Sequence, residues 1–468
     1  MHKVMTTNNL QNYSNKRKCS LQLPAAISSC LIRLGFGTVI HWSSPAIPHL
    51  TSSNSKFIIN SNEASWVVSL ATFGALIGFL LYPLFFNRIG RKYTMLLFAI
   101  PQIFSWLTIY YASNVYHLYA ARILSGIGYS ASYVVDIIYV GEIAEKNIRG
   151  FLIVIGKIAY VLGSLIVVIL GAFVTYDNMN LILLLISLIF VVTFSFMPES
   201  PYFYIKINRE EDAFQSLVKL RGTRDTKLLE LEIESMKKGI IKTNNSKKIL
   251  LMKLFSVRSN RKALLICTLG TLSFAFSGST VIAGHAQTII GYIDTPLKPE
   301  QATVLIMIIV LISSIIISPI PDLLGRRILT FLYGILVGLS SFTIGGFFFY
   351  KYYFNGQLSS IYWIPFVALL IYIVGSSSGL LSLSQIQVAE LLSIEIKSSA
   401  SSINNILWSI VDFFLQLSFG YLVSVFKIYG VFWLYGIVTL IITLSNYIIM
   451  PETKGKTLEE IQELLEEM

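Results

Sequence analysis

Charged residues are scarce in this chain. They make up 13% of its 468 residues, and hydrophobic residues make up 54%. Soluble domains carry about 25% charged residues. A soluble multidomain protein with buried helices is the alternative interpretation, but the many long apolar runs leave too little polar surface for it. The composition therefore predicts a protein that lies in lipid.

Cysteine and complete catalytic motifs are also scarce. The three cysteines, Cys19, Cys30 and Cys267, lie in the polar N-terminal tail or within apolar runs, without the spacing of a metal site or a disulfide framework. Gly375-Ser-Ser-Ser-Gly379 fits a nucleophile elbow but lies in an apolar run. Gly455-Lys-Thr457 resembles the end of a phosphate loop, yet Met450 replaces its first glycine. We expect no enzyme activity, catalytic residue, nucleotide, cofactor or metal.

Apolar runs dominate what remains. A transmembrane helix needs about 20 predominantly apolar residues, and twelve runs approach that length. Six lie in the first part of the chain, near 21–45, 64–86, 93–112, 116–141, 150–173 and 179–197. Six follow near 262–290, 302–321, 328–350, 361–388, 399–425 and 428–450. The predicted fold is an all-α membrane protein with twelve transmembrane helices in two pseudo-symmetric six-helix bundles.

The distribution of positive charge predicts the topology. The net charge is +11, but it does not indicate a nucleic-acid partner, because the basic residues concentrate in alternate loops. They precede the first run, follow the second and fourth, and crowd 206–262, whereas the other loops hold Lys56, Lys298 and Lys351. Lysine and arginine accumulate in cytoplasmic loops. Both termini and the central polar stretch are therefore expected in the cytoplasm, and the lipid bilayer is an expected partner.

The two halves of the chain repeat each other. Asn87-Arg-Ile-Gly-Arg-Lys92 after the second run corresponds to Asp322-Leu-Leu-Gly-Arg-Arg327 after the eighth. Pro198-Glu-Ser-Pro201 and Pro451-Glu-Thr453 end the sixth and twelfth runs. Matched signatures at matched places imply a parallel duplication. The predicted domains are a cytoplasmic N-terminal tail, an N-terminal bundle, a cytoplasmic loop with short helices, a C-terminal bundle and a cytoplasmic C-terminal tail, at 1–20, 21–197, 198–260, 261–450 and 451–468.

The repeated loops carry arginines and acids that can form a conformational gate. Arginine is always charged and presents forked donors, so it can pair with the repeated acids where the bundles meet on the cytoplasmic side. The alternative is that these residues only set the topology, with snorkelling side chains. The predicted gate residues are Arg88, Arg91, Glu142, Arg149, Glu199, Arg326, Arg327, Glu390, Lys397 and Glu452. Gly74-x-x-x-Gly78 and Gly334-x-x-x-Gly338 predict close contacts between helices.

Taken together, these motifs resemble the sugar porter family of the major facilitator superfamily, and within it the insect facilitated trehalose and hexose transporters. The resemblance covers about 21–465 and implies alternating access around a central site, with cytoplasmic pairs that stabilise an outward-facing state. Its further marks are Trp42-Ser-Ser-Pro45, Ala121-Arg122 with Gly126 and Gly128, Tyr139-x-x-Glu142, Arg149-Gly150, Ala389-Glu390-Leu391 and Pro451-Glu-Thr-Lys-Gly-Lys-Thr457.

The substrate site departs from that family. Where the family places glutamines in spans five and seven, this chain has Lys157 in span five, and Phe274 and Ala275 in span seven. The Gly-Pro-x-Pro-Trp run of span ten is replaced by Gly379-Leu-Leu-Ser-Leu-Ser-Gln385. A site without paired donors and acceptors discriminates poorly between hydroxylated substrates. The predicted substrate-binding residues are Lys157, Ser277, Thr280, Gln385 and Trp408.

Ionisable residues within the spans are candidates for function. Lys157 lies eight residues past Arg149, about 12 Å into the membrane at 1.5 Å per residue, and Asp136 on the preceding span lies at a similar depth. The sequence therefore predicts an Asp136–Lys157 pair facing the cavity, which Arg33 can join. The alternative is a pair that only neutralises two charges between helices. Asp412 has no partner that the sequence indicates.

The predicted function is facilitative transport of trehalose or a hexose across the plasma membrane. Proton-coupled relatives keep a carboxylate in span one, whereas here Phe36-Gly37 is followed by Thr38, Val39 and Ile40. Asp136 keeps a proton-coupled sugar symporter open as an alternative. A non-transporting nutrient receptor with a degenerate sugar site is a third reading.

Overall fold

The computed structural model describes residues 20–145, 147–223, 225–242, 254–293, 295–317, 320–354, 363–393, 396–456 and 458–467. Nearly all of the predicted tail 1–20 therefore lies outside the described residues. Within the described ranges the chain forms helices and the turns between them, without a strand.

Six long helical segments form the first half of the molecule. Each is long and apolar enough to cross a membrane, and each begins and ends within a few residues of a predicted span. The first crossing is made of two helices in succession, α2 and α3. The elements are α2 (Gln22–His41), α3 (Ser43–Leu50), α4 (Ser61–Ile89), α5 (Arg91–Tyr110), α6 (Val115–Ile143), α7 (Arg149–Phe173) and α8 (Tyr176–Ser195).

The second half repeats this arrangement with more interruptions. Its first crossing is broken at Gly278, which has a φ of +74°, and a π-helical segment, η2, interrupts the crossing before α20. The elements are α13 (Arg258–Phe276), α14 (Ser279–Gly284), α15 (Ala286–Gly291), α16 (Pro299–Ile317), α17 (Ile320–Leu324), α18 (Arg326–Phe354), α19 (Trp363–Val374), η2 (Gly375–Leu380), α20 (Leu381–Leu391) and α21 (Lys397–Ile449).

Helix α21 supplies two crossings. Its 53 residues would span about 80 Å at 1.5 Å per residue, far more than the hydrocarbon core of about 30 Å. The helical geometry breaks at Lys427, where φ is 58° and ψ is 171°. Before the break Ser402 bonds to Tyr82 near the end of α4, and after it Thr443 packs on Gly334 near the start of α18. The described chain thus contains the predicted twelve crossings.

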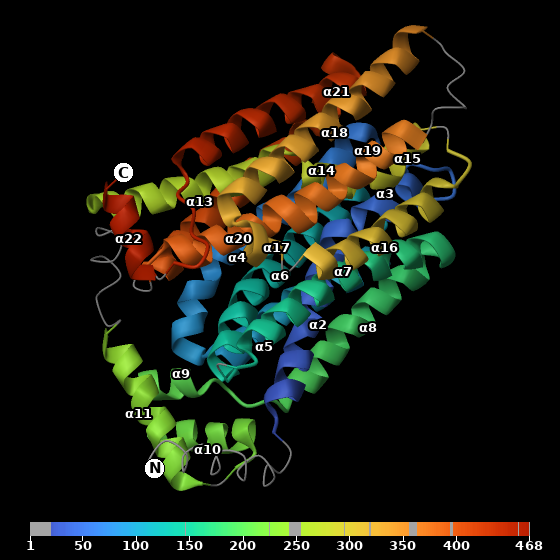
Figure 1. The fold of residues 1–468 in the computed structure, drawn as a ribbon. Coiled ribbons are helices and arrows are strands. Elements are labelled where there is room, and N and C mark those ends of the chain that lie inside the picture. The colour runs from blue at the N-terminus through green and yellow to red at the C-terminus, as the bar shows by residue number, and fades with distance from the viewer. Residues whose placement is uncertain are drawn as a thin grey trace.

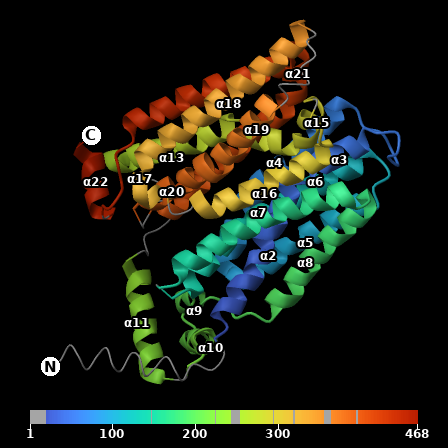
Figure 2. The same cartoon turned by 45° about the vertical axis from the view of Figure 1, so that its right-hand side comes forward.

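The two halves lie side by side (Figures 1 and 2). Their seam is formed mainly by α4 against α21 and by α7 against α16. The helices α9 (Pro201–Lys206), α10 (Glu210–Arg221) and α11 (Thr226–Lys242), which join the halves, lie at the same end of the molecule as α22 (Leu458–Glu467). We call this the linker end. The opposite end, where α3 and α15 lie, is the loop end.

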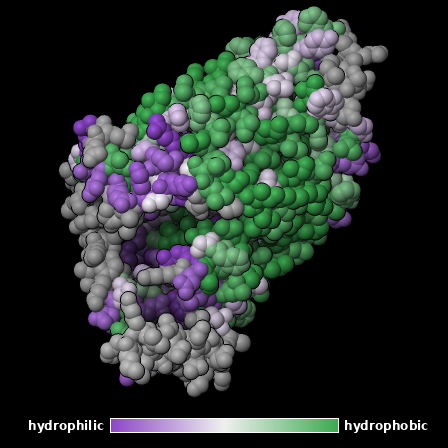
Figure 3. All heavy atoms as spheres, in the orientation of Figure 1, coloured by the Kyte–Doolittle hydropathy of each residue, from purple (hydrophilic) through white to green (hydrophobic). Residues whose placement is uncertain are grey.

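Small residues allow the helices of each half to approach closely. A Cβ placed on Gly74 would lie 2.2 Å from the backbone oxygen of Ile123 in α6, and one on Gly334 would lie 2.1 Å from the Thr443 side chain in α21. The predicted close contacts at the two Gly-x-x-x-Gly motifs are therefore confirmed. Hydrophobic residues cover the middle of the face drawn in Figure 3 and hydrophilic ones gather toward the ends, as a bilayer requires.

Candidate functional site

The halves close on each other at the loop end. At the linker end a hollow opens (Figure 3) beside the contact between α4 and α21, which persists there through the Tyr82–Ser402 hydrogen bond. At the loop end the backbone N–H of Gln287 donates to the Ser44 hydroxyl across the seam at 3.3 Å, and Trp42 and Ile290 are fully buried. At the linker end Figure 3 shows a hollow between the halves, lined partly by hydrophilic residues. A solute can therefore enter the seam from the linker end.

Two hydrogen bonds join α20 of the second half to α7 and α6 of the first half. The Lys157 ammonium in α7 donates to the Ser382 hydroxyl in α20 at 2.6 Å. One turn further along α20, the Gln385 amide donates to the Tyr133 hydroxyl in α6 at 3.0 Å. Gln385 is exposed although it lies deep within a crossing and faces the other half. Lys157, Tyr133 and Ser382 are partly exposed, and we call these four residues the seam site.

Aromatic rings of the first half form a wall beside the seam site. The Phe36 ring lies 4.9 Å from the Tyr133 ring and 5.0 Å from the Tyr160 ring, and it stacks on Tyr129 at 4.5 Å. Lys157 and Tyr160 are three residues apart in α7 and share one face of that helix. Ligand pockets combine such apolar surfaces with a few placed polar groups. The arrangement suits a ligand with both apolar and polar faces.

The structure places the predicted substrate-binding residues differently. Lys157 and Gln385 belong to the seam site. Trp408 lies four residues before Asp412 on the same face of α21, and its indole N–H has no hydrogen-bond partner among the described residues. Ser277 does not fit the prediction, because it is fully buried and its hydroxyl donates to the Phe274 carbonyl in its own helix at 2.6 Å.

Thr280 binds a carboxylate that the sequence left without a partner. Its hydroxyl donates to Asp412, which also accepts hydrogen bonds from Gln416 at 2.5 Å and from Thr72 of the first half at 3.3 Å. Asp412 is fully buried. The spacing of Asp412 and Gln416 places them on one helix face, but nothing in the sequence indicated Thr72. We call these four residues the Asp412 bridge, because they join the two halves.

The predicted Asp136–Lys157 pair is wrong. Asp136 is fully buried and pairs with Arg33 of α2, which is 4% exposed. The Arg33 guanidinium lies over Gly156 of α7, where an added Cβ would meet it at 2.5 Å. Lys157, the next residue, points from a different face of α7 toward Ser382. Asp136 therefore meets Arg33, which the sequence named only as a possible third member, and the helix faces decided which charges meet.

The predicted gate residues form one cluster at the linker end of each half. In the first half, Arg91 donates to both carboxylate oxygens of Glu142, at 2.6 and 2.7 Å, while Glu199 accepts the backbone N–H groups of Arg91 and Lys92 at 3.1 and 2.9 Å. The Ser200 hydroxyl also donates to Glu142.

The second half repeats this cluster. Arg326 donates to Glu390 at 2.8 Å, and Glu452 accepts the backbone N–H groups of Arg326 and Arg327 at 2.9 and 3.1 Å. The Thr453 hydroxyl donates to Glu390 at 2.6 Å. Each cluster lies within one half. The expectation that these pairs need the bundles to meet is therefore wrong, since they form while the linker end is hollow.

The remaining predicted gate residues bond to backbone or lie exposed. Arg149 donates to the Ala144 carbonyl at 3.3 Å, and Arg327 donates to the Tyr447 carbonyl at 3.0 Å. Lys397 donates to the Ala389 carbonyl. Arg88 is exposed. Arg149, Arg327 and Lys397 thus bond within their own half, and a gating role stays a prediction.

The carboxylates of Glu199 and Glu452 titrate differently. Burial raises the pKa of Glu199 to about 7, although hydrogen bonds from the backbone N–H groups of Ser200, Lys92 and Arg91 act against it. Burial acts in the same direction on Glu452, but its backbone N–H donors outweigh burial and lower its pKa below the usual value. Because the pKa of Glu199 is raised by folding, its contribution to stability is lost as the pH rises through about 7.

Both clusters require a glycine at the turn. Gly90 has a φ of +92° and Gly325 a φ of +91°, and an added Cβ would lie 2.4 Å from Glu199 and 2.6 Å from Glu452. We expect Gly90→Ala and Gly325→Ala each to destabilise the protein by about 1–3 kcal/mol through backbone strain and collision, measured as a lower melting temperature in detergent. Gly141→Ala is the control, because nothing lies within 4 Å of its Cβ position. An unchanged melting temperature in both turn variants would contradict the strain.

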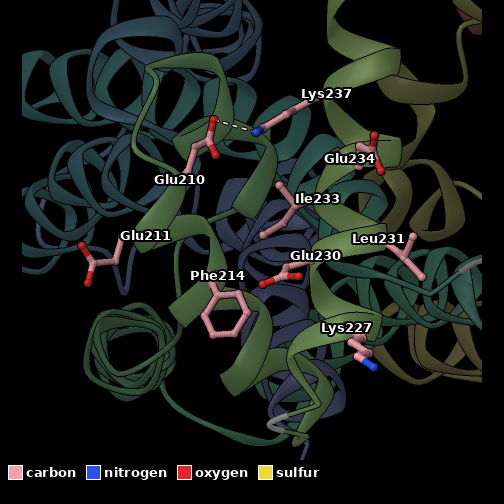
Figure 4. A pocket seen from close by; sticks show the side chains of 9 residues that line it. All are labelled: Glu210, Glu211, Phe214, Lys227, Glu230, Leu231, Ile233, Glu234 and Lys237. Carbon is pink, nitrogen blue, oxygen red and sulfur yellow. Dashed lines mark ion pairs between the residues drawn. The ribbon is translucent and has the colours of Figure 1, made fainter.

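A second hollow lies outside the seam, in the linker. It measures about 680 Å³ and lies between α10 and α11 (Figure 4). Its rim carries both charges, with Glu210 paired to Lys237 at 2.6 Å, and its apolar floor includes Phe214 and Ile233. The residues that line this hollow all belong to the linker, between Glu210 and Lys237, and none of them belongs to the seam site.

The sequence is similar to those of known transporters. The sequence model of the family described as "Sugar (and other) transporter" matches residues 21–465. The facilitated trehalose transporter Tret1 of Polypedilum vanderplanki is 28% identical over 449 residues, which cover 94% of this chain and 87% of that relative. The Tret1 of Apis mellifera ligustica is 28% identical over 447 residues, with 95% and 88% covered. The chain spans 48% of the longer Tret1 of Drosophila virilis, which is also 28% identical.

Solved structures agree on the fold. The inward open conformation of the xylose transporter XylE from E. coli superposes with a TM-score of 0.78 at 19% identity, covering 95% of this chain and 99% of that chain. The proton:xylose symporter XylE bound to 6-bromo-6-deoxy-D-glucose gives a TM-score of 0.75, also at 19% identity, with 95% and 99% covered. The predicted major facilitator fold is confirmed, and the chain belongs to the family of sugar and other transporters.

Proposed function

We propose that this chain is a facilitative sugar transporter of the plasma membrane that works by alternating access, with its linker end in the cytoplasm. The observation that carries the proposal is the hollow between the halves at one end (Figure 3), with the exposed Gln385 in the seam, while the other end is closed. Membership of a transporter family agrees with the prediction that the chain is not an enzyme.

The placement of the linker end in the cytoplasm rests on its positive charge. Arg91, Lys92, Arg326 and Arg327 lie at this end, and basic residues accumulate on the cytoplasmic side of membrane proteins. With this orientation the structure is the inward-facing state of the cycle. The relatives are named for trehalose and the solved neighbours for xylose. We propose trehalose or a hexose as the substrate class.

Transport down a gradient, without a proton, is supported by the position of the acids. Helix α2 contains no Asp or Glu, and Asp136 is paired with Arg33. A carboxylate that is paired with a buried cation, as Asp136 is, is stabilised in its charged form. It is therefore poorly suited to take up and release a proton in each cycle.

Counterflow tests this function directly. We expect the purified full-length chain in liposomes to exchange labelled sugar against an internal pool of the same sugar, with a rate unchanged when a protonophore removes the pH gradient. The panel should include trehalose, glucose, fructose, polyols and acidic hexose derivatives, and empty liposomes are the control. A rate that falls with the pH gradient would favour a symporter. Binding of a sugar without any counterflow would favour a non-transporting receptor.

A further inference from the structure

Lys157 is the partly exposed cation of the seam, and no carboxylate pairs with it among the described residues. Arg33 is paired with Asp136. Arg122, which is 1% exposed, donates to the backbone oxygens of Val67 and Val39, both at 3.0 Å. Among the described residues, the Lys157 ammonium has a hydrogen bond to the neutral Ser382 hydroxyl and no carboxylate within ion-pair distance.

The cations near the seam differ in their partners. Asp412 does not pair with Lys157. Its carboxylate oxygens accept hydrogen bonds from the Thr280, Thr72 and Gln416 side chains. Of the three cations, Arg33 is paired with Asp136 and Arg122 is held by two backbone oxygens, whereas Lys157 has a single hydroxyl. An uncompensated charge away from bulk water is costly. A ligand that brings a negative charge to Lys157 removes this cost.

The hydrogen-bond donors of Lys157 also favour a negatively charged ligand. An ammonium has three donors and no acceptor, so two donors remain after the bond to Ser382. The family resemblance places a glutamine here, whose amide can both donate to and accept from sugar hydroxyls. The lysine cannot accept, and it binds carboxylate or phosphate oxygens better than hydroxyls because such hydrogen bonds are charge-assisted.

The residues around Lys157 can contact the rest of a sugar. The Phe36, Tyr133 and Tyr160 rings offer apolar faces next to it, and Gln385 offers an amide oxygen, since its nitrogen is engaged by Tyr133. We infer that the sugar carried by this chain bears an acidic group, a carboxylate or a phosphate, that binds the Lys157 ammonium. This inference rests on the proposed function and narrows its substrate from hexoses to acidic hexose derivatives.

The test compares charged and neutral forms of one sugar. The full-length protein in liposomes is assayed by counterflow with labelled glucose, glucuronate, glucuronate methyl ester and glucose 6-phosphate at equal concentration. We expect one of the two anions to exchange at least tenfold faster than glucose and than the neutral ester. The glucuronate and phosphate arms distinguish a carboxylate from a phosphate as the bound group.

Two variants connect this preference to Lys157. Lys157→Gln is expected to lose anion exchange by tenfold or more and to keep or gain glucose exchange. Lys56→Gln is the matched control, since Lys56 is an exposed lysine at the loop end, and it should leave both rates unchanged. The comparison of glucuronate with its methyl ester uses the unaltered protein, so it decides the matter even if Lys157→Gln does not fold.

The outcomes separate this inference from the proposed function. Glucose exchange equal to or faster than both anions in the unaltered protein would overturn the inference and leave sugar transport standing. If no sugar exchanges, binding is measured by the shift in melting temperature. Stabilisation by glucuronate or glucose 6-phosphate that is lost in Lys157→Gln would support the site and overturn transport. The absence of any such stabilisation would overturn both.

Discussion

Arg33→Met is expected to remove most of the folded protein from the membrane. The substitution leaves the Asp136 carboxylate, which is fully buried, without the cation that it now contacts. Breaking a buried ion pair on one side costs about 3–5 kcal/mol, a large part of a typical stability of about 5–15 kcal/mol. Asp136→Asn should have a similar effect, because it leaves the Arg33 charge unpaired. The measurement is the yield of monodisperse protein, with the melting temperature of what remains.

The double variant Arg33→Met with Asp136→Asn distinguishes pairing from two unrelated defects. It leaves no unpaired charge, so its yield should return toward that of the unaltered protein. The exposed pair Lys56–Asp177, with side chains 59% and 43% accessible, is the control: Lys56→Met should cost about 0–1 kcal/mol. Two mild, additive single variants would show that the buried pair contributes little.

The ion-pair partner of Asp136 could not be predicted from the sequence, because it depends on how the helices pack. Apolar length indicates where a helix enters the membrane, so similar depths of Asp136 and Lys157 could be predicted from residue counts alone. The direction of each side chain around its helix depends on how α2, α6 and α7 pack. Gly156 permits Arg33 to approach α7 closely. A glycine in an apolar run does not, however, predict which side chain will pack against it.

Sequence motifs predicted contacts within one half better than they predicted contacts between the halves. The repeated Gly-Arg loops predicted the acids that Arg91 and Arg326 contact, because these groups lie on neighbouring elements of one half. The same motifs could not show that the contacts persist when the linker end is hollow. Ser277 likewise lies in a family motif, but a serine within a helix can donate to a carbonyl of its own preceding turn, and here it does.

The Asp412 bridge could not be found from either half by itself. Its carboxylate and two of its donors, Thr280 and Gln416, belong to the second half, and Thr72 belongs to the first. The Gln416 amide also donates to the Thr72 hydroxyl at 3.0 Å. Any movement that separates α4 from α21 at this depth must break the bonds to Thr72. The bridge therefore stabilises the state in which the loop end is closed.

Asp412→Asn is accordingly expected to open the loop end. The amide keeps the size of the carboxylate but removes its charge, and hydrogen bonds to charged groups contribute about 1.5–3 kcal/mol against about 1 kcal/mol for neutral ones. A loss of about 1–2 kcal/mol shifts the equilibrium toward the outward-open state by roughly five- to thirtyfold. Thr72→Val should act in the same direction, because it removes the contribution of the first half.

The shift is measured by labelling a cysteine placed at the closed end. Ser44→Cys, in a chain whose three native cysteines are replaced by serine, should react with a membrane-impermeant maleimide faster when Asp412→Asn is added. Ser409→Ala is the matched control: Ser409 is fully buried in the same helix, but its hydroxyl bonds to the Asn405 carbonyl within that helix. Equal labelling with and without Asp412→Asn, or an equal rise with Ser409→Ala, would show that the bridge does not hold the loop end closed.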